Sequence, residues 1–318
     1  MSAPRPPVPY GATAVRPHWT DLPERLRERI QERLGGTVVA AASQDSGFTP
    51  GFASRLVYAT GERAFVKAVS TRMSPAIADS YAAEARTAAK LPAAVPAPRL
   101  RWTLEELEWV VLCFDDVPGH PPVRPWQPRE LTDVLTALTS LAETLTPAPA
   151  GLLLPEARDW LVQDFGYWRD LLRDNGGTPN QQVFELAALE KSAPDALRGE
   201  AVVHCDLRDD NVLVGDDGTV WFCDWNWPSR GPAWLDLVTL LISVRGDGYD
   251  ADALLAAHPL GESADADAVD AVLAGLSGYF TRESLQPKTA GSPYLRAHQA
   301  WYAEATLSWL AVRRGWVG

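Results

Sequence analysis

The segment that most constrains the fold is Val202–Val214, VVHCDLRDDNVLV, where six charged or amide side chains lie between two short apolar runs. Both runs read as strands, so the polar residues are expected on a loop beside a core. Ionisable side chains are costly to bring near a core unless they are paired or bind a ligand. The fold must therefore give this loop a ligand or a set of partners. The six residues are His204, Asp206, Arg208, Asp209, Asp210 and Asn211.

An Asp followed five positions later by an Asn, as in Asp206 and Asn211, can place a carboxylate and an amide oxygen in one cleft. Phosphoryl transfer needs such a pair: one group orients the attacking hydroxyl and takes its proton, and the other holds Mg²⁺. A second metal carboxylate is required, and Asp224 ends the strand after an Asp-Gly turn. The competing interpretation is a polar turn that satisfies its own hydrogen bonds.

The two segments HCDLRDDNVLV and VWFCDWNWPSRGPAWLDLVTLL resemble the motif region of the aminoglycoside phosphotransferase and choline kinase-like family. That family typically shows His-Gly-Asp-Leu, then Asn, Ile-Asp-Trp and Gly-x-Pro-x-x-Asp-Leu; here Cys205 stands in place of the first Gly. The resemblance covers nearly the whole chain from Trp19. It implies an α+β, two-lobed protein-kinase-like fold, with a small β-rich N-terminal lobe and a larger α-helical C-terminal lobe.

The resemblance also assigns roles. It makes Asp206 the catalytic base and makes Asn211 and Asp224 the Mg²⁺ ligands. His204 is expected to pack behind the loop, and Asp236 to tie down the backbone of the catalytic loop. Trp225, Asn226 and Trp227 are expected at the mouth of the cleft.

Arg208 stands two positions after Asp206, where protein kinases keep a Lys that meets the γ-phosphate. An Arg at this position could stabilise the transferring group. The alternative is a surface Arg paired with Asp209 or Asp210, a contact of small energetic value. The sequence leaves both interpretations open.

Lys67, in FVKAV, is flanked by apolar residues on a predicted strand of the first lobe. A helix is predicted over residues 74–91, and Glu84 lies on its apolar face at helical spacing. A carboxylate on an apolar face needs a cationic partner. Lys67 paired with Glu84 would match the arrangement that kinases use at the nucleotide phosphates.

The loop between the first two predicted strands contains Gly47 and Gly51 but no Gly-x-Gly-x-x-Gly. It is a weak phosphate-loop candidate, since an ordinary hairpin turn would look similar. The strand VVLCF followed by DDVPG resembles the family's adenine-binding segment. Backbone groups near Phe114 and Asp116 are therefore expected to pair with the base.

The chain divides into a Pro-rich, partly disordered arm over 1–18, a nucleotide-binding lobe with its hinge over 19–116, and a catalytic and substrate-binding lobe over 117–318. An early helix is expected to be capped by Thr20 or Asp21 and to end at Gly35 and Gly36. Later helices are expected over 128–145, 155–173 and 180–191, and from an N-cap at Ser292 to a C′ residue at Gly315.

The formal net charge is −12, and the sequence contains no basic stripe that could neutralise phosphates. Both features argue against a nucleic-acid partner. The longest apolar run, WLDLVTLLISV, is too short to span a bilayer and contains Asp236. Three cysteines without a secretory leader favour reduced, buried thiols in a cytoplasmic protein. The sequence gives no oligomeric state.

These features predict a small-molecule kinase that uses ATP, or GTP, with Mg²⁺. Only eleven residues separate Asp224 from Asp236, too few for the activation segment of a protein kinase. A non-catalytic nucleotide-binding module is the alternative, but it would normally have lost one of the three motif residues.

The acceptor is expected to be an aminoglycoside-like antibiotic, an amino sugar or an amino alcohol, bound between helices in 155–191 and 265–315. The net charge and the acidic residues on those helices suggest a cationic acceptor. These acidic residues are Asp159, Asp164, Asp170 and Glu304.

Overall fold

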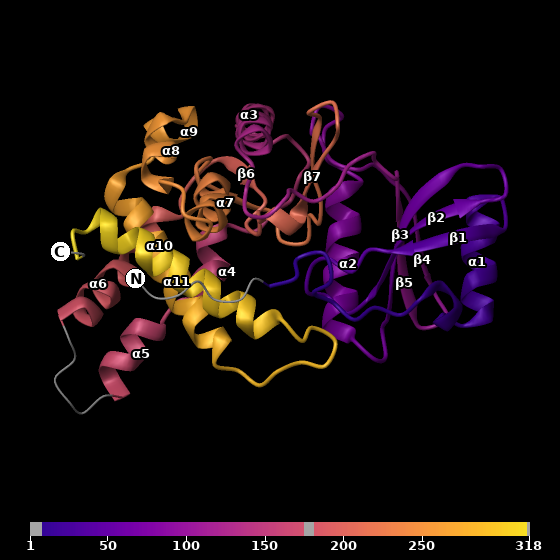
Figure 1. Cartoon of the computed structure of the whole chain (residues 1–318), viewed down its shortest axis with the longest axis horizontal. Coiled ribbons are helices and arrows are strands. Elements are labelled where there is room, and N and C mark those ends of the chain that lie inside the picture. Colours follow the sequence, from indigo (N-terminus) through magenta and orange to yellow (C-terminus); the bar gives the residue numbers. More distant parts are fainter. Residues whose placement is uncertain (1–7, 175–180, 317–318) are drawn as a thin grey trace.

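The computed structural model describes residues 8–174 and 181–316. Its first part is an antiparallel sheet of five strands in the order β1-β2-β3-β5-β4 (Figure 1). Hairpins join β1 to β2 and β2 to β3, so the Gly-containing loop predicted at the phosphates lies between β1 and β2. The strands are β1 (Val38–Ser43), β2 (Phe52–Tyr58), β3 (Arg63–Ser70), β4 (Leu100–Glu106) and β5 (Trp109–Phe114).

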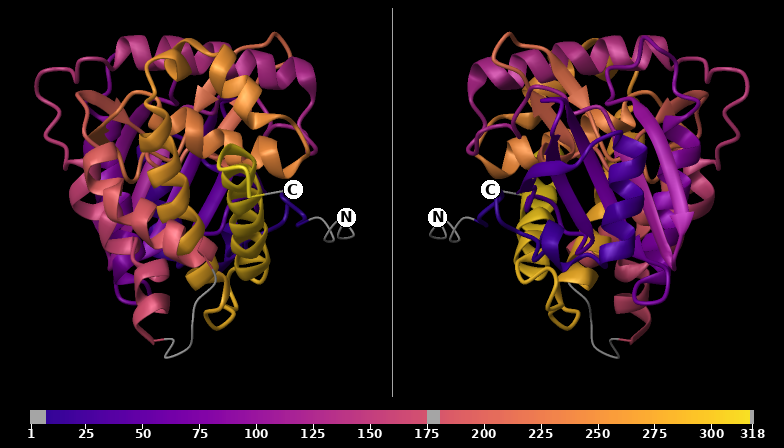
Figure 2. Two further views of the ribbon diagram at one scale, coloured as in Figure 1. Left: turned by 90° about the vertical axis from the view of Figure 1, so that its left-hand side faces the viewer. Right: turned by 90° about the vertical axis from the view of Figure 1, so that its right-hand side faces the viewer.

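Two helices, α1 (Glu24–Leu34) and α2 (Pro75–Ala88), cover opposite faces of this sheet. Successive side chains of a strand point to opposite faces, so Val66 on β3 packs in the core beneath α1 while Val69 packs against α2. Lys67 shares the face of Val69. Figure 2, whose right-hand view faces the small lobe, shows α1 across the outer face of the sheet. Lys67 therefore points inward, toward α2 and the larger lobe.

The start of α1 differs from the prediction. Residues Trp19–Asp21 form a short 3₁₀ turn, and α1 begins only after Pro23. The carboxylate of Asp21 accepts a hydrogen bond from the backbone N–H of His18, at 2.7 Å, so neither Thr20 nor Asp21 caps α1. The end agrees with the prediction, because Gly35 adopts a left-handed conformation with φ 75°.

The larger lobe is helical and has one continuous core. The segment between β5 and α3 joins it to the sheet, and a lobe boundary near Asp116 stays a prediction consistent with that connection. Its helices are α3 (Pro128–Thr144), α4 (Ala157–Asp164), α5 (Tyr167–Asp174), α6 (Gln181–Ala196), α7 (Leu235–Gly246), α8 (Ala251–Ala257), α9 (Pro259–Glu262), α10 (Ala266–Ser284) and α11 (Leu295–Arg313).

Two short antiparallel pairs frame the catalytic segment within this lobe: β6 (Ala201–Val203) with β9 (Ser229–Gly231), and β7 (Val212–Val214) with β8 (Val220–Phe222). A one-turn 3₁₀ helix, η2 (Asp209–Asn211), leads into β7. The polar residues of the opening motif thus lie on a loop between two strands, as the sequence predicts.

Helix α7 is buried on all sides, as expected for a helix that is apolar all round. Its twelve residues include most of the apolar run WLDLVTLLISV. Within residues 8–174 and 181–316, no helix has the length and apolar character needed to cross a membrane.

Two helix predictions in this lobe need correction. The helix expected over 155–173 breaks at Gly166, whose φ of 142° is strained for any other residue, and becomes α4 and α5. The final helix begins at Leu295 rather than after Ser292, because the Ser292 hydroxyl donates to the carbonyl of Phe48 instead of capping. Gly315 follows its end with φ 67°, as predicted. Asn180, the expected start of α6, lies outside the described residues.

Residues 8–18 do not form a free arm. The backbone N–H groups of Thr13 and Ala14 donate to the carbonyl of Asp45, and that of Val15 donates to Gly291. The ring of Tyr10 lies edge-on to Trp301 on α11. This segment is therefore ordered against both lobes, because its two buried residues and its backbone have partners there. The rest of the predicted arm, residues 1–7, lies outside the described residues.

Candidate active site

Asp236 on α7 holds the backbone of the catalytic loop. One carboxylate oxygen accepts from the N–H of His204 at 2.7 Å, and the other accepts from the N–H of Cys205 at 2.9 Å. All three residues are buried. These two hydrogen bonds agree with the predicted structural role of Asp236.

His204 joins this loop to the end of β8. Its Nε2 lies 2.7 Å from the carbonyl of Cys223, and its Nδ1 accepts the N–H of Asp206 at 3.4 Å. These two contacts require a neutral ring with the proton on Nε2. Burial agrees, because it lowers the pKa of His204. The imidazole therefore fixes the backbone beside Asp206 relative to the backbone beside Asp224.

Two residues of the motif adopt left-handed backbone conformations: Cys205, with φ 65°, and Asp224, with φ 67°. A non-glycine residue in this region costs roughly 1–2 kcal/mol. The conformation explains why a Gly suits the position of Cys205 in the motif that the sequence resembles.

The thiols fit the prediction of small buried residues. Cys113 and Cys205 are buried and Cys223 is half-buried. Burial raises the pKa of Cys113 and of Cys223 to about 12 and raises the pKa of Cys205 well above its usual value, so all three stay protonated at neutral pH. A protonated thiol is a poor nucleophile and a poor metal ligand.

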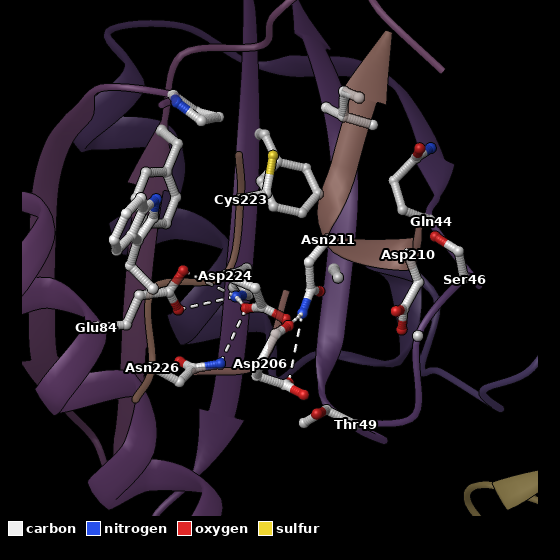
Figure 3. Close-up of a pocket in the computed structure, with 18 of the residues that line it drawn as sticks. Gln44, Ser46, Thr49, Glu84, Asp206, Asp210, Asn211, Cys223, Asp224 and Asn226 are labelled. Carbon is white, nitrogen blue, oxygen red and sulfur yellow. Dashed lines mark hydrogen bonds and ion pairs between the residues drawn. The ribbon is translucent and has the colours of Figure 1, made fainter. Parts of the chain in front are cut away.

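Asp206, Asn211 and Asp224 face one cavity (Figure 3). The Asn211 amide nitrogen donates to the Asp206 carbonyl at 2.7 Å and approaches its carboxylate at 3.4 Å. Burial raises the pKa of Asp206 to about 6. The carboxyl of Asp206 is therefore mostly ionised at pH 7 and can accept a proton.

Arg208 does not point to the surface. Its guanidinium makes two hydrogen bonds of 3.0 Å to Asp210 and a third to the Asp206 carboxylate. The pairing with Asp210 agrees with one of the two interpretations from the sequence, although Arg208 is not at the surface. Its action on a transferring phosphoryl group stays a prediction. Its guanidinium lies 5.9 Å from the ring centre of Phe48.

Lys67 bridges two carboxylates. Its ammonium lies 2.8 Å from Glu84 on α2, which is the ion pair predicted from the apolar helix face, and it also contacts Asp224 from the other lobe. Burial alone would lower the pKa of Lys67, but Asp224 and Glu84 outweigh it and raise that pKa. Burial raises the pKa of Glu84 to about 7 even though Lys67 opposes it.

The cavity around Lys67 has a volume of about 420 Å³ and lies between the lobes. Gly47, with φ 80°, lies on its wall. Gly51 does not; a Cβ there would lie 2.7 Å from the Tyr81 hydroxyl, so this Gly is needed for packing. Trp225, Asn226 and Trp227 line the cavity, as the sequence predicts.

The hinge lies on the same cavity through Phe114 and Asp116. The Asp116 carboxylate is engaged by Arg55 at 3.1 Å and by Arg63 at 2.6 Å. Only the backbone of this residue is therefore free to meet a ligand, in line with the expectation for a base-binding hinge.

The oxygen atoms on this cavity suit a hard divalent cation. Asn211 and Asp224 supply an amide and a carboxylate, and the buried side-chain oxygen of Asn226 has no hydrogen-bond partner within the described ranges. Mg²⁺ in phosphotransfer sites takes one or two protein oxygens and completes its shell with phosphate and water. Among the described residues, no group of three or more His, Cys, Asp or Glu side chains is placed so that it could hold a metal ion.

A second cavity, of about 400 Å³, opens on the other side of Asp206. Its wall comes from α4, α10 and α11, within the ranges predicted for the acceptor, and also from α7. The two cavities meet at five shared residues, which are Phe48, Thr49, Asp206, Arg208 and Trp227.

The prediction that four acidic residues surround this pocket is largely wrong. Of the four residues named, only Asp164 lies on the cavity wall. Asp159 lies 3.6 Å from Arg158, and Asp170 pairs with Arg173, both away from the cavity. Glu304 is on α11 but does not line the cavity. Helical position places an acid on an element but does not say which side of it faces the ligand.

Sequence reasoning missed Arg16, which lines the first cavity. Its guanidinium donates to the carbonyls of Thr49, Gly51 and Ser46 at 2.5, 2.9 and 2.9 Å. It therefore fixes the β1–β2 loop. The only available signal was an Arg in a Pro-rich segment, which carries little information.

Arg124 was also missed, because DDVPGHPPVRP reads as a linker. Its guanidinium lies 2.6 Å from Asp209 in η2 and 2.6 Å from Asp247. It also faces the rings of Tyr10 and Trp301 at 4.8 and 5.0 Å. This buried cation therefore holds the element that carries Asn211.

The comparisons with known proteins agree with this geometry. A model of the phosphotransferase enzyme family matches residues 45–287. No curated protein sequence matches significantly. The structure resembles a thermostable mutant of aminoglycoside phosphotransferase APH(4)-Ia, in a ternary complex with ADP and hygromycin B, with 15% identity and a TM-score of 0.59 over 92% of this chain and 99% of that one.

Two further solved structures have the same arrangement. APH(4)-Ia itself is 14% identical, with a TM-score of 0.58 over 92% of this chain and 99% of that one. Aminoglycoside phosphotransferase APH(3'')-Id from Streptomyces rimosus is 17% identical, with a TM-score of 0.50 over 89% and 99%. At these identities the likeness concerns the fold, and it confirms the predicted two-lobed, protein-kinase-like α+β architecture.

Proposed function

The chain belongs to the phosphotransferase enzyme family, and from that premise we propose that it transfers the γ-phosphoryl group of ATP to a hydroxyl of a small molecule. One observation carries the proposal. Asp206 lies where two cavities meet, one lined by Lys67, Asn211 and Asp224 and the other by aromatic side chains. A base at such a junction can face both a nucleotide phosphate and an acceptor hydroxyl.

In this proposal the first cavity binds the nucleotide. Lys67, oriented by Glu84, meets the α- and β-phosphates, as the β3 Lys of kinases does. The β1–β2 loop with Gly47 lies over the phosphates, and backbone groups near Phe114 and Asp116 pair with the base. Since the contacts at the base come from the backbone, GTP stays an alternative to ATP.

Asn211 and Asp224 are the residues that would hold Mg²⁺, with Asn226 next to them. A bound Mg²⁺ would neutralise charge on the phosphates. The amide nitrogen of Asn211 donates a hydrogen bond to the backbone carbonyl of Asp206. The amide oxygen of Asn211 is therefore the atom that would bind the metal ion.

The chemical step in this proposal rests on Asp206 and Arg208. The Asp206 carboxylate orients the acceptor hydroxyl and takes its proton as the hydroxyl oxygen attacks the γ-phosphorus and the bond to the β-phosphate oxygen breaks. Arg208 contacts Asp206 and lies on both cavities, so its charge can stabilise the transferring group. His204 and Asp236 hold the loop rigid while this happens.

The alternative is a non-catalytic nucleotide-binding module. It is disfavoured because Asp206, Asn211 and Asp224 are all present and face the same cavity (Figure 3). A coupled assay for ADP release, run with Mg-ATP and with and without a panel of hydroxylated amines and sugars, tests this. Acceptor-dependent ADP release that is lost in Asp206→Asn supports the enzyme. Nucleotide binding with no transfer to any acceptor supports the module.

The acceptor range taken from the sequence is an aminoglycoside-like antibiotic, an amino sugar or an amino alcohol. We propose a cytoplasmic location from the three free cysteines, and no nucleic-acid partner from the net charge of −12.

A further inference from the structure

We propose that His298 hydrogen-bonds a hydroxyl of the acceptor, and that the acceptor is a hydroxylated compound with an apolar face and at most one positive charge. This inference rests on the proposed phosphotransfer and concerns only what the second cavity accepts. It narrows the range above, away from polycationic antibiotics and toward molecules with one amine or none.

The first observation is that His298, on α11, lies on the cavity wall with both ring nitrogens unused. The residue is 2% exposed, and neither nitrogen has a hydrogen-bond partner within residues 8–174 and 181–316. Leaving a buried polar group unpaired costs roughly 1–3 kcal/mol. The centre of its ring lies 4.3 Å from the ring centre of Phe48 and 4.3 Å from that of Tyr302, so aromatic packing holds it in place.

The charge of this ring decides what it can bind. Burial, with Arg208 and Arg124 nearby and Asp210 opposing them, lowers the pKa of His298 to about 3. The imidazole is therefore neutral at physiological pH and presents one donor and one acceptor nitrogen. A hydroxyl, which can donate or accept, matches either nitrogen.

The walls of the cavity are mostly apolar and aromatic. Trp160 and Trp227 lie with ring centres 5.8 Å apart and planes inclined by 32°, and Trp160 is fixed by a 2.7 Å hydrogen bond to Ser229. Tyr279 and Phe280 add further rings from α10. Such walls favour a ligand with a flat apolar face, through area burial and stacking.

The charges on the cavity wall are few. The carboxylates are Asp164 and Asp206, and Asp206 already pairs with Arg208. Asp164 lies 3.9 Å from Arg282, and this neighbouring positive charge weakens the attraction of the Asp164 carboxylate for a ligand cation. A polycationic acceptor would bring several charges into a site with one partly engaged carboxylate, and unpaired buried charges are costly. One ligand amine, at Asp164, is the most the wall can satisfy.

The acceptor class is tested by calorimetric titration in the presence of AMP-PNP and Mg²⁺. The probes are 4-nitrophenyl β-glucoside, its singly charged 2-amino analogue, streptomycin and hygromycin B. We expect one of the two aryl glycosides to bind at least tenfold more tightly than both antibiotics. A panel in which neither does so overturns the proposed acceptor class. AMP-PNP binding is titrated first without acceptor, and its absence would reject the proposed function whatever the acceptors do.

The role of His298 is tested with His298→Phe, which keeps the aromatic packing and removes both nitrogens. We expect the Kd of the tighter aryl glycoside to rise roughly five- to tenfold, the AMP-PNP Kd to stay unchanged, and the Tm of the free protein to hold or rise. His298→Gln, which restores a donor and an acceptor, should recover part of the affinity. A glycoside Kd within twofold of wild type in His298→Phe overturns the assignment.

His258 provides a matched control. It is also buried, but its Nε2 lies 3.0 Å from the carbonyl of Leu135 and 3.2 Å from the hydroxyl of Thr139. His258→Phe should therefore lower the Tm and leave the glycoside Kd unchanged. If both His variants lower the Tm and neither changes the Kd, His298 is a structural residue and the assignment fails.

Discussion

Lys67 and Asp224 form an ion pair across the cleft, from β3 of the small lobe to the end of β8 in the large lobe. The same ammonium contacts Glu84 at 2.8 Å, so one cation links two carboxylates on different elements. It also lies 5.1 Å from the ring centre of Tyr81. The position of Lys67 therefore depends on both lobes, and a change to any member of this group should affect the others.

The first prediction is that Lys67 and Glu84 act as a unit. Lys67→Ala, Glu84→Ala and the double variant should lose similar amounts of kcat/KM, because each change removes the same oriented cation. A double-mutant cycle on kcat/KM measures this. The exposed pair of Arg72 and Glu108, 4.0 Å apart, is the control, and its variants should keep full activity. Strictly additive losses for Lys67 and Glu84 would show that they work independently.

The second prediction separates the base from the metal ligand. Asp206→Ala should lower turnover by roughly 10²–10⁴-fold and leave Mg-ATP binding nearly intact, because the base acts only in the chemical step. Asp224→Ala should instead weaken Mg-nucleotide binding. Turnover is followed by ADP release, and binding by titration with Mg-AMP-PNP. A turnover of Asp206→Ala within tenfold of wild type would reject Asp206 as the base.

The third prediction concerns pH. Burial raises the pKa of Asp206 to about 6, and a base must be deprotonated to act, so kcat should rise with pH through about 6 and level off above it. Glu84, with a pKa near 7, could add a second step. The profile is therefore also measured in Glu84→Gln, which should keep the step near 6. A flat profile between pH 5 and 8 in both proteins would contradict the assignment.

The motif residues could be predicted from the sequence because the relevant signals are local. Asp206 and Asn211 are five positions apart on one loop, and Glu84 stands out on the apolar face of a single helix. Lys67 was found because a carboxylate on an apolar helix face, such as Glu84, needs a cationic partner. The role of Asp236 in holding the catalytic-loop backbone was predicted from the family resemblance. The hydrogen bonds that Asp236 accepts from His204 and Cys205 agree with that role.

The residues that were missed act through contacts between distant segments. Arg16 holds a loop more than thirty positions away, and Arg124 donates to Asp247 across 123 positions. No periodicity or spacing encodes such contacts. The expected cap at Ser292 failed for the same reason, because that hydroxyl bonds Phe48 in the other lobe. The place of His298 on the wall of the second cavity likewise depends on how α11 packs.

The fourth prediction is that Arg124 stabilises the catalytic loop. Its side chain and that of Asp209 are both buried, so Arg124→Gln leaves a buried carboxylate without its cationic partner. Removing one member of a buried ion pair typically costs about 3–5 kcal/mol. Urea unfolding measures the loss. Arg198, paired with Asp195 on the surface, is the control, and Arg198→Gln should cost about 1 kcal/mol or less. Equal losses for the two variants would contradict the proposed role.

The last prediction follows from the backbone of Cys205. At φ 65° a glycine avoids a strain of roughly 1–2 kcal/mol, against a loss of about 0.5–1 kcal/mol for its greater freedom in the unfolded chain. Cys205→Ala loses the buried sulfur and keeps the strain, whereas Cys205→Gly loses the sulfur and relieves it. The Gly variant should therefore be the more stable of the two in urea unfolding, by up to about 1.5 kcal/mol.

Cys113 gives the opposite expectation and serves as the control. It is fully buried on β5, where the backbone is extended, so Cys113→Gly should be less stable than Cys113→Ala. The two sites thus differ in backbone conformation while the side chain removed is the same. If Ala were more stable than Gly at both positions, the strain at Cys205 would not contribute measurably, and the preference for Gly in the motif would need another cause, such as the close approach of a ligand to the loop.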